Sequence, residues 1–207
     1  MKYVFGALII AVCVALIATG IHLWRVSLKN KKEMTQYEQT REIAVKPFPK
    51  TLVIYYSLTG RTRDIAKKIA EKTNADTYEV QTIKPLPKGA LLHLEVKNSL
   101  KNKSYPEING NFPDLTAYDI IFVGAPVWWY TVATPMLSFL NKTDFQGKKV
   151  VPFSTQGSNV GTYFEDFAAN AKNAVPAPSA SFNNLPEKYD QAVNNKIAVW
   201  LNKIIEN

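Results

Sequence analysis

The sequence contains very little cysteine and histidine, and these shortages exclude several kinds of site. Its 207 residues include one cysteine, Cys13, and two histidines, His22 and His93. A single cysteine allows neither an intrachain disulfide nor a C-x-x-C redox pair. A metal site built from cysteines or from several histidines is excluded for the same reason, so we expect no metal ion. If the protein carries out redox chemistry, a bound cofactor must therefore supply it.

Two widespread phosphate-binding motifs are also absent. Neither G-x-x-x-x-G-K-S/T nor G-x-G-x-x-G occurs, which argues against a P-loop nucleotide hydrolase and against the dinucleotide fingerprint. The net charge of +8 is concentrated near the N-terminus, where residues 1–50 hold 8 Lys/Arg and 3 Asp/Glu. We interpret this excess as a membrane-surface feature. The lack of a basic patch interleaved with aromatic residues predicts no nucleic-acid partner.

Charged side chains are missing altogether from Tyr3 to Trp24, a stretch of 22 residues. That length suffices for a helix to cross a bilayer, and an aromatic residue stands at each end. We therefore predict a transmembrane anchor over residues 1–25. The alternative is a cleaved signal peptide, because Lys2 gives a basic start and Ala18-Thr19-Gly20 provides a small-x-small site. The apolar stretch is longer than the ~7–15 residues of a signal core.

The charges that flank this stretch predict its orientation. Only Lys2 precedes it, whereas Arg25, Lys29, Lys31 and Lys32 follow closely. The positive-inside rule then predicts a single-pass protein of the cell membrane with its soluble domain in the cytoplasm. Export after signal peptide cleavage is the alternative. Residues 26–50 are polar, and we expect them to form a stalk before a domain over residues 51–207.

A first candidate binding loop follows the apolar stretch Leu52–Tyr56, which predicts a strand buried on both faces. The strand ends in Ser57–Thr62 (SLTGRT), and apolar residues at 65, 66, 69 and 70 then predict a helix. Hydroxyl groups and backbone N–H groups at a helix N-terminus suit a phosphate. The alternative is an ordinary helix N-cap.

Two further loops follow predicted strands over residues 118–124 and 148–155. The first contains three consecutive aromatic residues, 128–130, which cannot all face one core. Some of them are expected to contact a planar ligand at the carboxyl edge of the sheet; the alternative is that they cover a loop. Thr134 is expected to cap the helix that follows. The second loop, 156–161, is small, polar and glycine-bearing, which suits the polar edge of a flat ligand.

The remaining pattern predicts strands over residues 76–83 and around 180–182, and helices over 90–101, 163–171 and 193–204. Five strands that alternate with helices indicate an α/β fold. The sequence pairs no nucleophile with a base, so we predict no catalytic side chain. His93 lies on the 90–101 helix, and we interpret it as a solvated or core-edge residue.

Together the three loops resemble those of flavodoxins, and the resemblance covers residues 51–207. The Pro-x-Trp-Trp form is similar to that of a bacterial flavodoxin-like branch, although Tyr130 and Asn159 stand where glycine is usual. The resemblance implies a flavodoxin-like three-layer sandwich with a five-stranded parallel sheet of order 2-1-3-4-5. It also implies non-covalent FMN, with the phosphate on the first loop and the ring between the other two. The residues so implied are Ser57, Leu58, Thr59, Gly60, Arg61, Thr62, Pro126, Val127, Trp128, Trp129, Tyr130, Thr155, Gln156, Gly157 and Ser158.

The function that this resemblance implies is electron transfer by a membrane-tethered FMN protein, with a redox protein or a quinone as partner. One alternative is an NAD(P)H-dependent FMN quinone reductase. A further alternative is a flavin-free scaffold or adaptor. The fold alone does not decide between them.

Overall fold

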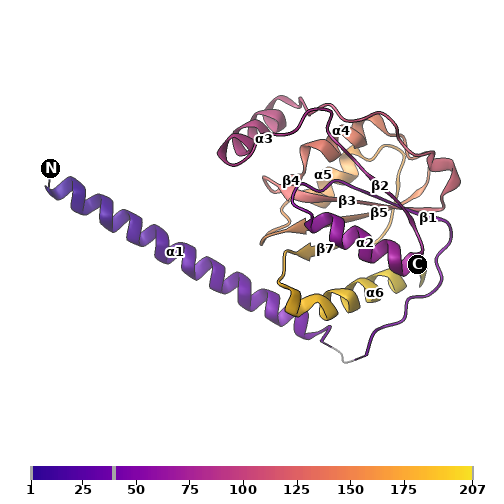
Figure 1. Ribbon diagram of the computed structural model, residues 1–207, viewed down its shortest axis with the longest axis horizontal. Coiled ribbons are helices and arrows are strands. Elements are labelled where there is room, and N and C mark those ends of the chain that lie inside the picture. The colour runs from indigo at the N-terminus through magenta and orange to yellow at the C-terminus, as the bar shows by residue number, and fades with distance from the viewer. Residues whose placement is uncertain (1, 39–40, 207) are drawn as a thin grey trace.

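The computed structural model describes residues 2–38 and 41–206 and contains an α/β domain preceded by one long helix. That helix, α1 (Lys2–Thr35), projects away from the domain (Figure 1). The fold class is the predicted one. The domain is a parallel sheet sandwiched between helices, with two short 3₁₀ helices, η1 (Leu115–Ala117) and η2 (Glu187–Tyr189), in its connections.

The sheet has the order β2-β1-β3-β5-β6, with all neighbours on this path parallel. The fold class is confirmed, but the number and order of strands differ slightly from the predicted five-stranded sheet of order 2-1-3-4-5. Two further strands bring the total to seven. β4 pairs antiparallel with β3, and β7 pairs parallel with β5, nearer the C-terminal end of β5 than β6 does. The strands are β1 (Thr51–Tyr55), β2 (Asp76–Glu79), β3 (Ile120–Trp128), β4 (Thr131–Val132), β5 (Lys149–Gln156), β6 (Val175–Pro176) and β7 (Ala180–Asn183).

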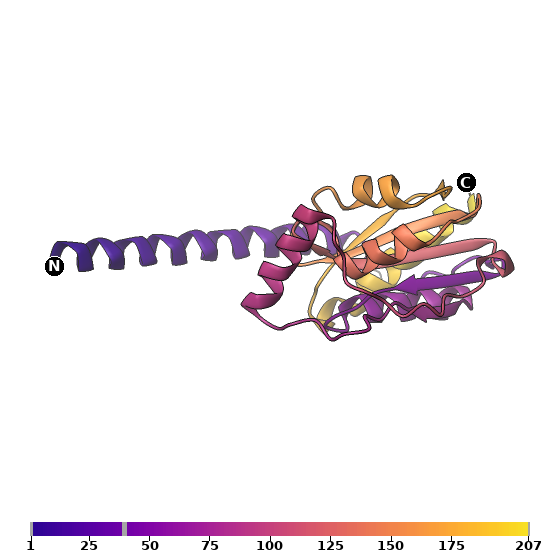
Figure 2. The same cartoon turned by 90° about the horizontal axis from the view of Figure 1, so that it is seen from above.

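Helices cover both faces of the sheet (Figures 1 and 2). On one face, α2 (Arg61–Thr73) and α6 (Asp190–Glu206) pack against the β-strands through a buried cluster that contains Ile69, Ile197 and Phe122. On the other face lie α4 (Thr134–Lys142) and α5 (Tyr163–Asn170). A further helix, α3 (Ala90–Asn102), lies at the end of the domain from which α1 projects (Figure 2).

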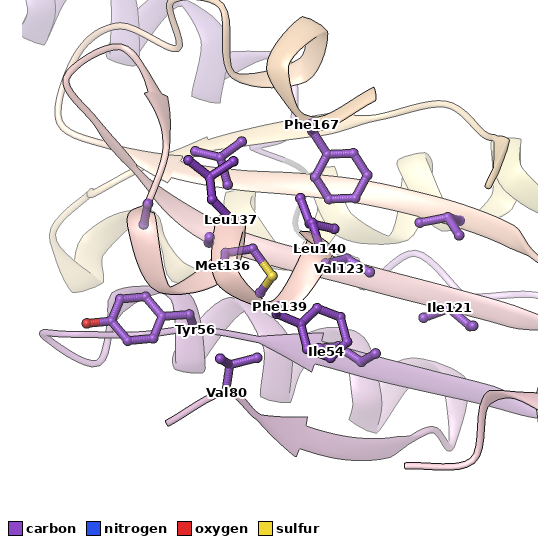
Figure 3. Close-up of a cluster of buried hydrophobic side chains, with 14 of the residues drawn as sticks. Ile54, Tyr56, Val80, Ile121, Val123, Met136, Leu137, Phe139, Leu140 and Phe167 are labelled. Atoms are coloured by element: carbon purple, nitrogen blue, oxygen red, sulfur yellow. The ribbon is translucent and has the colours of Figure 1, made fainter. Parts of the chain in front are cut away.

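The second buried cluster lies between the sheet and α4 and α5, and Figure 3 shows its side chains. Ile54, Val123 and Phe139 are completely buried there. Burying a side chain of this size contributes about 1.5–3 kcal/mol. In the strand β1 the neighbouring Val53 points to the opposite cluster, as the alternation of a strand requires. Both faces of the strand are therefore buried, which explains its unbroken apolar sequence.

Several element boundaries differ from the predictions. The second strand ends at Glu79, not at residue 83, because the chain then leaves the sheet and pairs Thr82 with Ile108. The third strand continues to Trp128, because its end forms a hairpin with β4. Thr134 is the first residue of α4, and Ala133 occupies the N-cap, so the predicted hydroxyl cap is not made.

The fifth strand predicted around residues 180–182 is β7, and a further short strand, β6, pairs with β5 nearer its start. Lys149 in β5 pairs with Val175, and Phe153 in the same strand pairs with Ala180. Pro178 lies between the two segments and has no N–H to donate to the sheet. Its carbonyl instead accepts a hydrogen bond from the Trp200 indole at 2.8 Å.

The helix α1 is longer than the predicted anchor. From Ile9 to Thr35 it is the one helix among the described residues that is long and apolar enough to cross a membrane, a property that signal sequences share. The side chains of Lys2 and Tyr3, which the orientation and aromatic-belt arguments used, lie outside the described part. At its C-terminal end Met34 is buried, at 2% exposure, in the core beneath α2 and α6.

The segment that follows α1 lies along α6. The backbone N–H groups of Ile43 and Lys46 donate to the side-chain oxygens of Asn195 and Asn202, at 3.3 and 2.9 Å. Phe48 stacks at a tilt on Phe122 in the core. Residues 39 and 40 lie outside the described residues. Described residues between Asn30 and Phe48 thus contact the domain at several points; the three segment boundaries given above remain predictions.

Candidate functional site

The turn between β1 and α2 has the features that a phosphate needs. Ser57 is buried, and its Oγ accepts the N–H of Gly60 at 3.1 Å. Gly60 has φ +92°, a conformation that favours glycine, and open space lies where a Cβ would stand. Residues 57–63 contain no carboxylate, and the first-turn N–H groups of α2 have no acceptor within the helix. The turn therefore offers backbone donors, and the nearest carboxylate in sequence is that of Asp64, in the first turn of α2.

A buried hydroxyl pair joins this turn to the third loop. Thr62 Oγ1 and Thr155 Oγ1 lie 2.7 Å apart, and both side chains are buried. Thr62 belongs to the first turn of α2, and Thr155 lies near the end of β5. The sequence predicted both residues for the site, and the fold brings them into contact.

The second loop is a two-residue hairpin turn under backbone strain. Val127 pairs with Val132 and Trp128 with Thr131, which leaves Trp129 and Tyr130 at the tip. Their φ angles are +49° and +65°. Two positive φ angles are the pattern of a type I′ turn, which normally carries Asn-Gly. Each aromatic residue in this conformation costs about 1–3 kcal/mol.

The three aromatic residues of this loop take different directions. Trp128 packs edge-on against Tyr56, with ring centroids 5.6 Å apart, and so covers the core. Trp129 and Tyr130 are 48% and 61% exposed. The hairpin thus turns one aromatic side chain inward and offers two to the surroundings, as the sequence led us to expect.

The segment that follows β5 contacts the backbone of the hairpin tip. The Tyr130 carbonyl accepts the backbone N–H of Thr162 at 2.8 Å. Gly161 has φ +59°, and a Cβ there would lie 2.2 Å from that carbonyl oxygen. Asn159, which stands where the resemblance has glycine, accepts the N–H of Gly161 at 2.9 Å. Its side chain is therefore used to shape the loop.

A cavity of about 340 Å³ opens between the hairpin and the third loop. Six of the predicted site residues line it: Val127, Trp129, Tyr130, Gln156, Gly157 and Ser158. The other nine, which are Pro126, Trp128, Thr155 and the six residues of the first loop, Ser57–Thr62, do not line it. The buried Gln156 amide donates to Asn183 at 3.1 Å and accepts from Ser154 at 3.0 Å, so it contacts neighbouring side chains within the sheet. Gly157 leaves open space beside the cavity.

Two residues of the cavity were not among the predicted site residues, His93 and Asn159. The His93 ring lies 6.5 Å from that of Trp129, and Lys97 Nζ lies 5.7 Å from the Trp129 ring. His93 is exposed, in agreement with its interpretation as a solvated residue, and it also lines the cavity. The long connection after β2 brings α3 to the site, and its sequence carries no motif that would have indicated this.

The charged side chains around the first turn are Arg61, Arg63 and Asp64 of α2 and Glu79 of β2. Glu79, at the end of β2, is paired with Arg63 at 2.6 Å, so its charge is compensated. The side chain of Arg61, at the start of α2, is exposed. Burial and then the Glu79 charge raise the pKa of Tyr56 to about 12, which keeps this phenol neutral. Among the described residues no group of His, Cys, Asp and Glu side chains could hold a metal ion.

A parallel sheet with a hydroxyl-rich turn, an aromatic hairpin and a glycine-bearing loop at one edge defines an α/β protein built to bind a mononucleotide. The family described as Flavodoxin matches residues 50–204, so the chain belongs to the flavodoxin family. This confirms the predicted family and fold.

Solved structures and one curated relative agree with this assignment. The FMN complex of a flavoprotein from Lactobacillus acidophilus superposes with a TM-score of 0.60 at 27% identity, covering 65% of this chain and 93% of that one. Its apo form, determined by NMR, gives a TM-score of 0.53, covering 70% and 99%. An NAD(P)H dehydrogenase (quinone) of Rhizobium rhizogenes is 37% identical over 105 residues, 49% of this chain and 51% of the relative. The chain thus spans about half of that curated relative.

FMN is the cofactor that the loops predicted, and membership of the flavodoxin family together with the FMN-bound relative confirms it. The roles of the individual loop residues stay predictions. What the structure adds is their arrangement at one edge of the sheet.

Proposed function

We propose that the domain holds FMN in this cleft and transfers electrons as a membrane-tethered redox protein. One observation carries the proposal. A turn of free donors and a cleft between aromatic and polar loops meet at a single sheet edge, joined by the Thr62–Thr155 contact at 2.7 Å. The first turn would hold the phosphate. Val127, Trp129, Tyr130 and the 156–158 backbone would contact the ring.

The chemistry at this site would come from the cofactor. FMN, when bound, supplies transfer of one or two electrons. The chain's own side chains would bind and orient it, since His93 and Tyr130 are the titratable side chains that line the cavity among the described residues. Trp129 and Tyr130 are exposed, so these two side chains would be within reach of both the flavin and a partner. Such an open site suits electron exchange with a second molecule.

A second candidate is an NAD(P)H-dependent quinone reductase, which the Rhizobium relative favours. In that reaction NAD(P)H gives up a hydride and becomes NAD(P)⁺. The quinone gains the electron pair and two protons, one of them from solvent, and becomes a quinol. The Rhizobium relative's name alone supports this candidate, and half of that relative lies outside the match.

The two candidates differ in how the full-length, FMN-loaded protein in nanodiscs responds to NAD(P)H without oxygen. For an electron carrier we expect no NAD(P)H consumption above that of free FMN, but rapid electron transfer from a chemically reduced sample to an added acceptor. NAD(P)H consumption proportional to protein, with quinol formed in equal amount, would instead establish the reductase. A bound flavin that passes electrons to no acceptor would contradict both.

We further propose that α1 spans the cell membrane with the domain on the cytoplasmic side. The support is the apolar stretch from Ile9 onward and the basic residues that follow Trp24. Protease added to intact protoplasts should leave the domain uncut, and a high-salt wash should leave the protein in the membrane pellet. Digestion from outside would reverse the orientation. A soluble form that starts near Ile21 would show signal peptide cleavage.

A further inference from the structure

The helix α1 is fixed to the same edge of the sheet that carries the cleft. Asn183, the last residue of β7, donates to Asn30 of α1 at 2.7 Å and accepts from Gln156 at 3.1 Å. Glu33 of α1 forms an ion pair with Lys196 of α6. Figures 1 and 2 show α1 projecting from the side of the domain where α3 and β4 lie. The direction of α1 is therefore tied to the direction in which the cleft opens.

Little chain separates this fixed point from the predicted membrane span. Trp24, the last residue of the uncharged stretch, lies six residues before Asn30 on the same helix. At 1.5 Å per residue the separation is about 9 Å. A continuous helix of this length provides no flexible hinge, so an α1 that spans a bilayer holds the cleft edge close to the bilayer surface.

The surface around the cleft has the composition of a membrane-contacting face. Outside α1, the large apolar side chains that are exposed among the described residues are Leu58, Ile83, Leu91, Leu94, Trp129, Tyr130 and Val175. All except Val175 lie on α3 or on segments that follow β1, β2 and β3 at the carboxyl edge. Residues 84–103, around α3, add five lysines and one acidic residue. Apolar side chains interspersed with lysines match an interface with anionic lipid headgroups.

We propose that this surface rests on the anionic bilayer that α1 spans, so that the cleft opens toward the membrane. We call it the flavin-edge surface: Leu58, Ile83, Leu91, Leu94, Trp129 and Tyr130, with Lys84, Lys88 and Lys97. The inference rests on the proposed function, in which α1 is a membrane span and the cleft holds FMN. It deepens that function because a lipid-soluble electron acceptor could reach the cleft directly from the bilayer.

The test measures how near each end of the domain lies to lipid. In full-length protein with Cys13→Ser, a fluorescent label is placed at Leu94→Cys on α3, or at Lys142→Cys at the far end of α4. Both positions are exposed. In vesicles of phosphatidylcholine and phosphatidylglycerol with nitroxide-labelled headgroups, we expect quenching at position 94 to exceed that at position 142 several-fold. Equal quenching at both positions, or stronger quenching at position 142, would overturn the proposal.

A second variant tests the role of the α1 contact. Glu33→Lys places a like charge against Lys196 and should free the domain to turn, which reduces the difference between positions 94 and 142. An unchanged difference would contradict the fixed orientation. Quenching of FMN fluorescence, measured in the same vesicles, separates the two hypotheses. Bound FMN without a positional difference contradicts only the membrane-facing surface, and a positional difference without bound FMN contradicts only the flavin site.

Discussion

At the residue scale, the least usual feature is a pair of aromatic residues in the left-handed conformation beside the cleft. Trp129 and Tyr130 hold φ angles of +49° and +65°, where glycine or asparagine would be unstrained. The Tyr130 carbonyl is held by Thr162, which fixes the strained turn. Strain of this kind is concentrated at ligand sites, where the surrounding structure maintains it.

Replacing Tyr130 with glycine should therefore stabilise the fold. We expect Tyr130→Gly to raise the free energy of unfolding by about 1 kcal/mol, because glycine adopts this φ without strain. Tyr130→Ala is the matched control, since it removes the ring and keeps the Cβ. Urea denaturation of both variants measures the difference. Equal unfolding free energies for Tyr130→Gly and Tyr130→Ala would show that the backbone at this position is not strained.

Gly161 should not accept even a methyl group. A Cβ at this position would lie 2.2 Å from the Tyr130 carbonyl oxygen, and φ is +59°. We expect Gly161→Ala to lower the free energy of unfolding by more than about 1 kcal/mol and to loosen the hairpin. Gly157→Ala, in the same loop with open space around it, should change stability little. Two variants of equal stability, compared by urea denaturation, would disprove the contact.

Tyr56 should make stability depend on alkaline pH. Its pKa rises from 10.0 to about 12 in the folded protein, mainly through burial. The unfolded chain therefore loses the phenol proton first, so the stabilisation is complete below pH 10 and is lost as pH rises through 12. Tyr56→Phe should reduce the decline in unfolding free energy across this interval. An identical decline in both proteins, measured by urea denaturation at each pH, would contradict the assignment.

At the scale of elements, two substitutions at Gly60, in the turn between β1 and α2, distinguish the effect of backbone strain on FMN affinity from the effect of charge. Gly60→Ala should weaken FMN binding, because φ is +92°. Gly60→Asp should weaken it roughly tenfold further, because the carboxylate opposes the phosphate at the helix N-terminus. Titration of FMN fluorescence measures both affinities. Equal affinities for the two variants would show that the phosphate does not bind at this turn.

The elements also show what the sequence could predict. The core strands β1, β3 and β5 were evident, because burial on both faces gives unbroken apolar runs. The end of β2 could not be predicted. Val80 follows the strand and is also buried, so the apolar pattern of a strand continues past its last residue. The positions of His93 and α3 depend on contacts between distant segments, and local periodicity carries no information about these.

At the scale of the whole molecule, the segment before residue 51 contributes to the core. Met34 is 2% exposed, and Val45 and Phe48 pack against the same cluster. These core contacts were not predicted, because polar residues surround these apolar ones and indicate a stalk. The chain from residue 26 to 207 should therefore fold as a stable soluble domain after the apolar stretch is removed.

Removal of residues 26–50 as well should lower the free energy of unfolding. We expect the 51–207 form to be less stable than the 26–207 form by at least about 2 kcal/mol, since loss of one buried methionine side chain alone costs that much. Chemical denaturation of the two forms gives the comparison. If their unfolding free energies agree, the contacts of Met34 and Phe48 contribute nothing to the fold.

The central claim is that the three loops hold FMN by its phosphate and its ring together. Titration of the full-length protein in nanodiscs with FMN and with riboflavin, which lacks the phosphate, tests it most directly. We expect one FMN per chain with strongly quenched flavin fluorescence, and riboflavin binding weaker by about a hundredfold, because roughly 3 kcal/mol of phosphate contacts are lost. A folded protein that leaves FMN fluorescence unchanged, or that binds riboflavin equally well, would contradict the account.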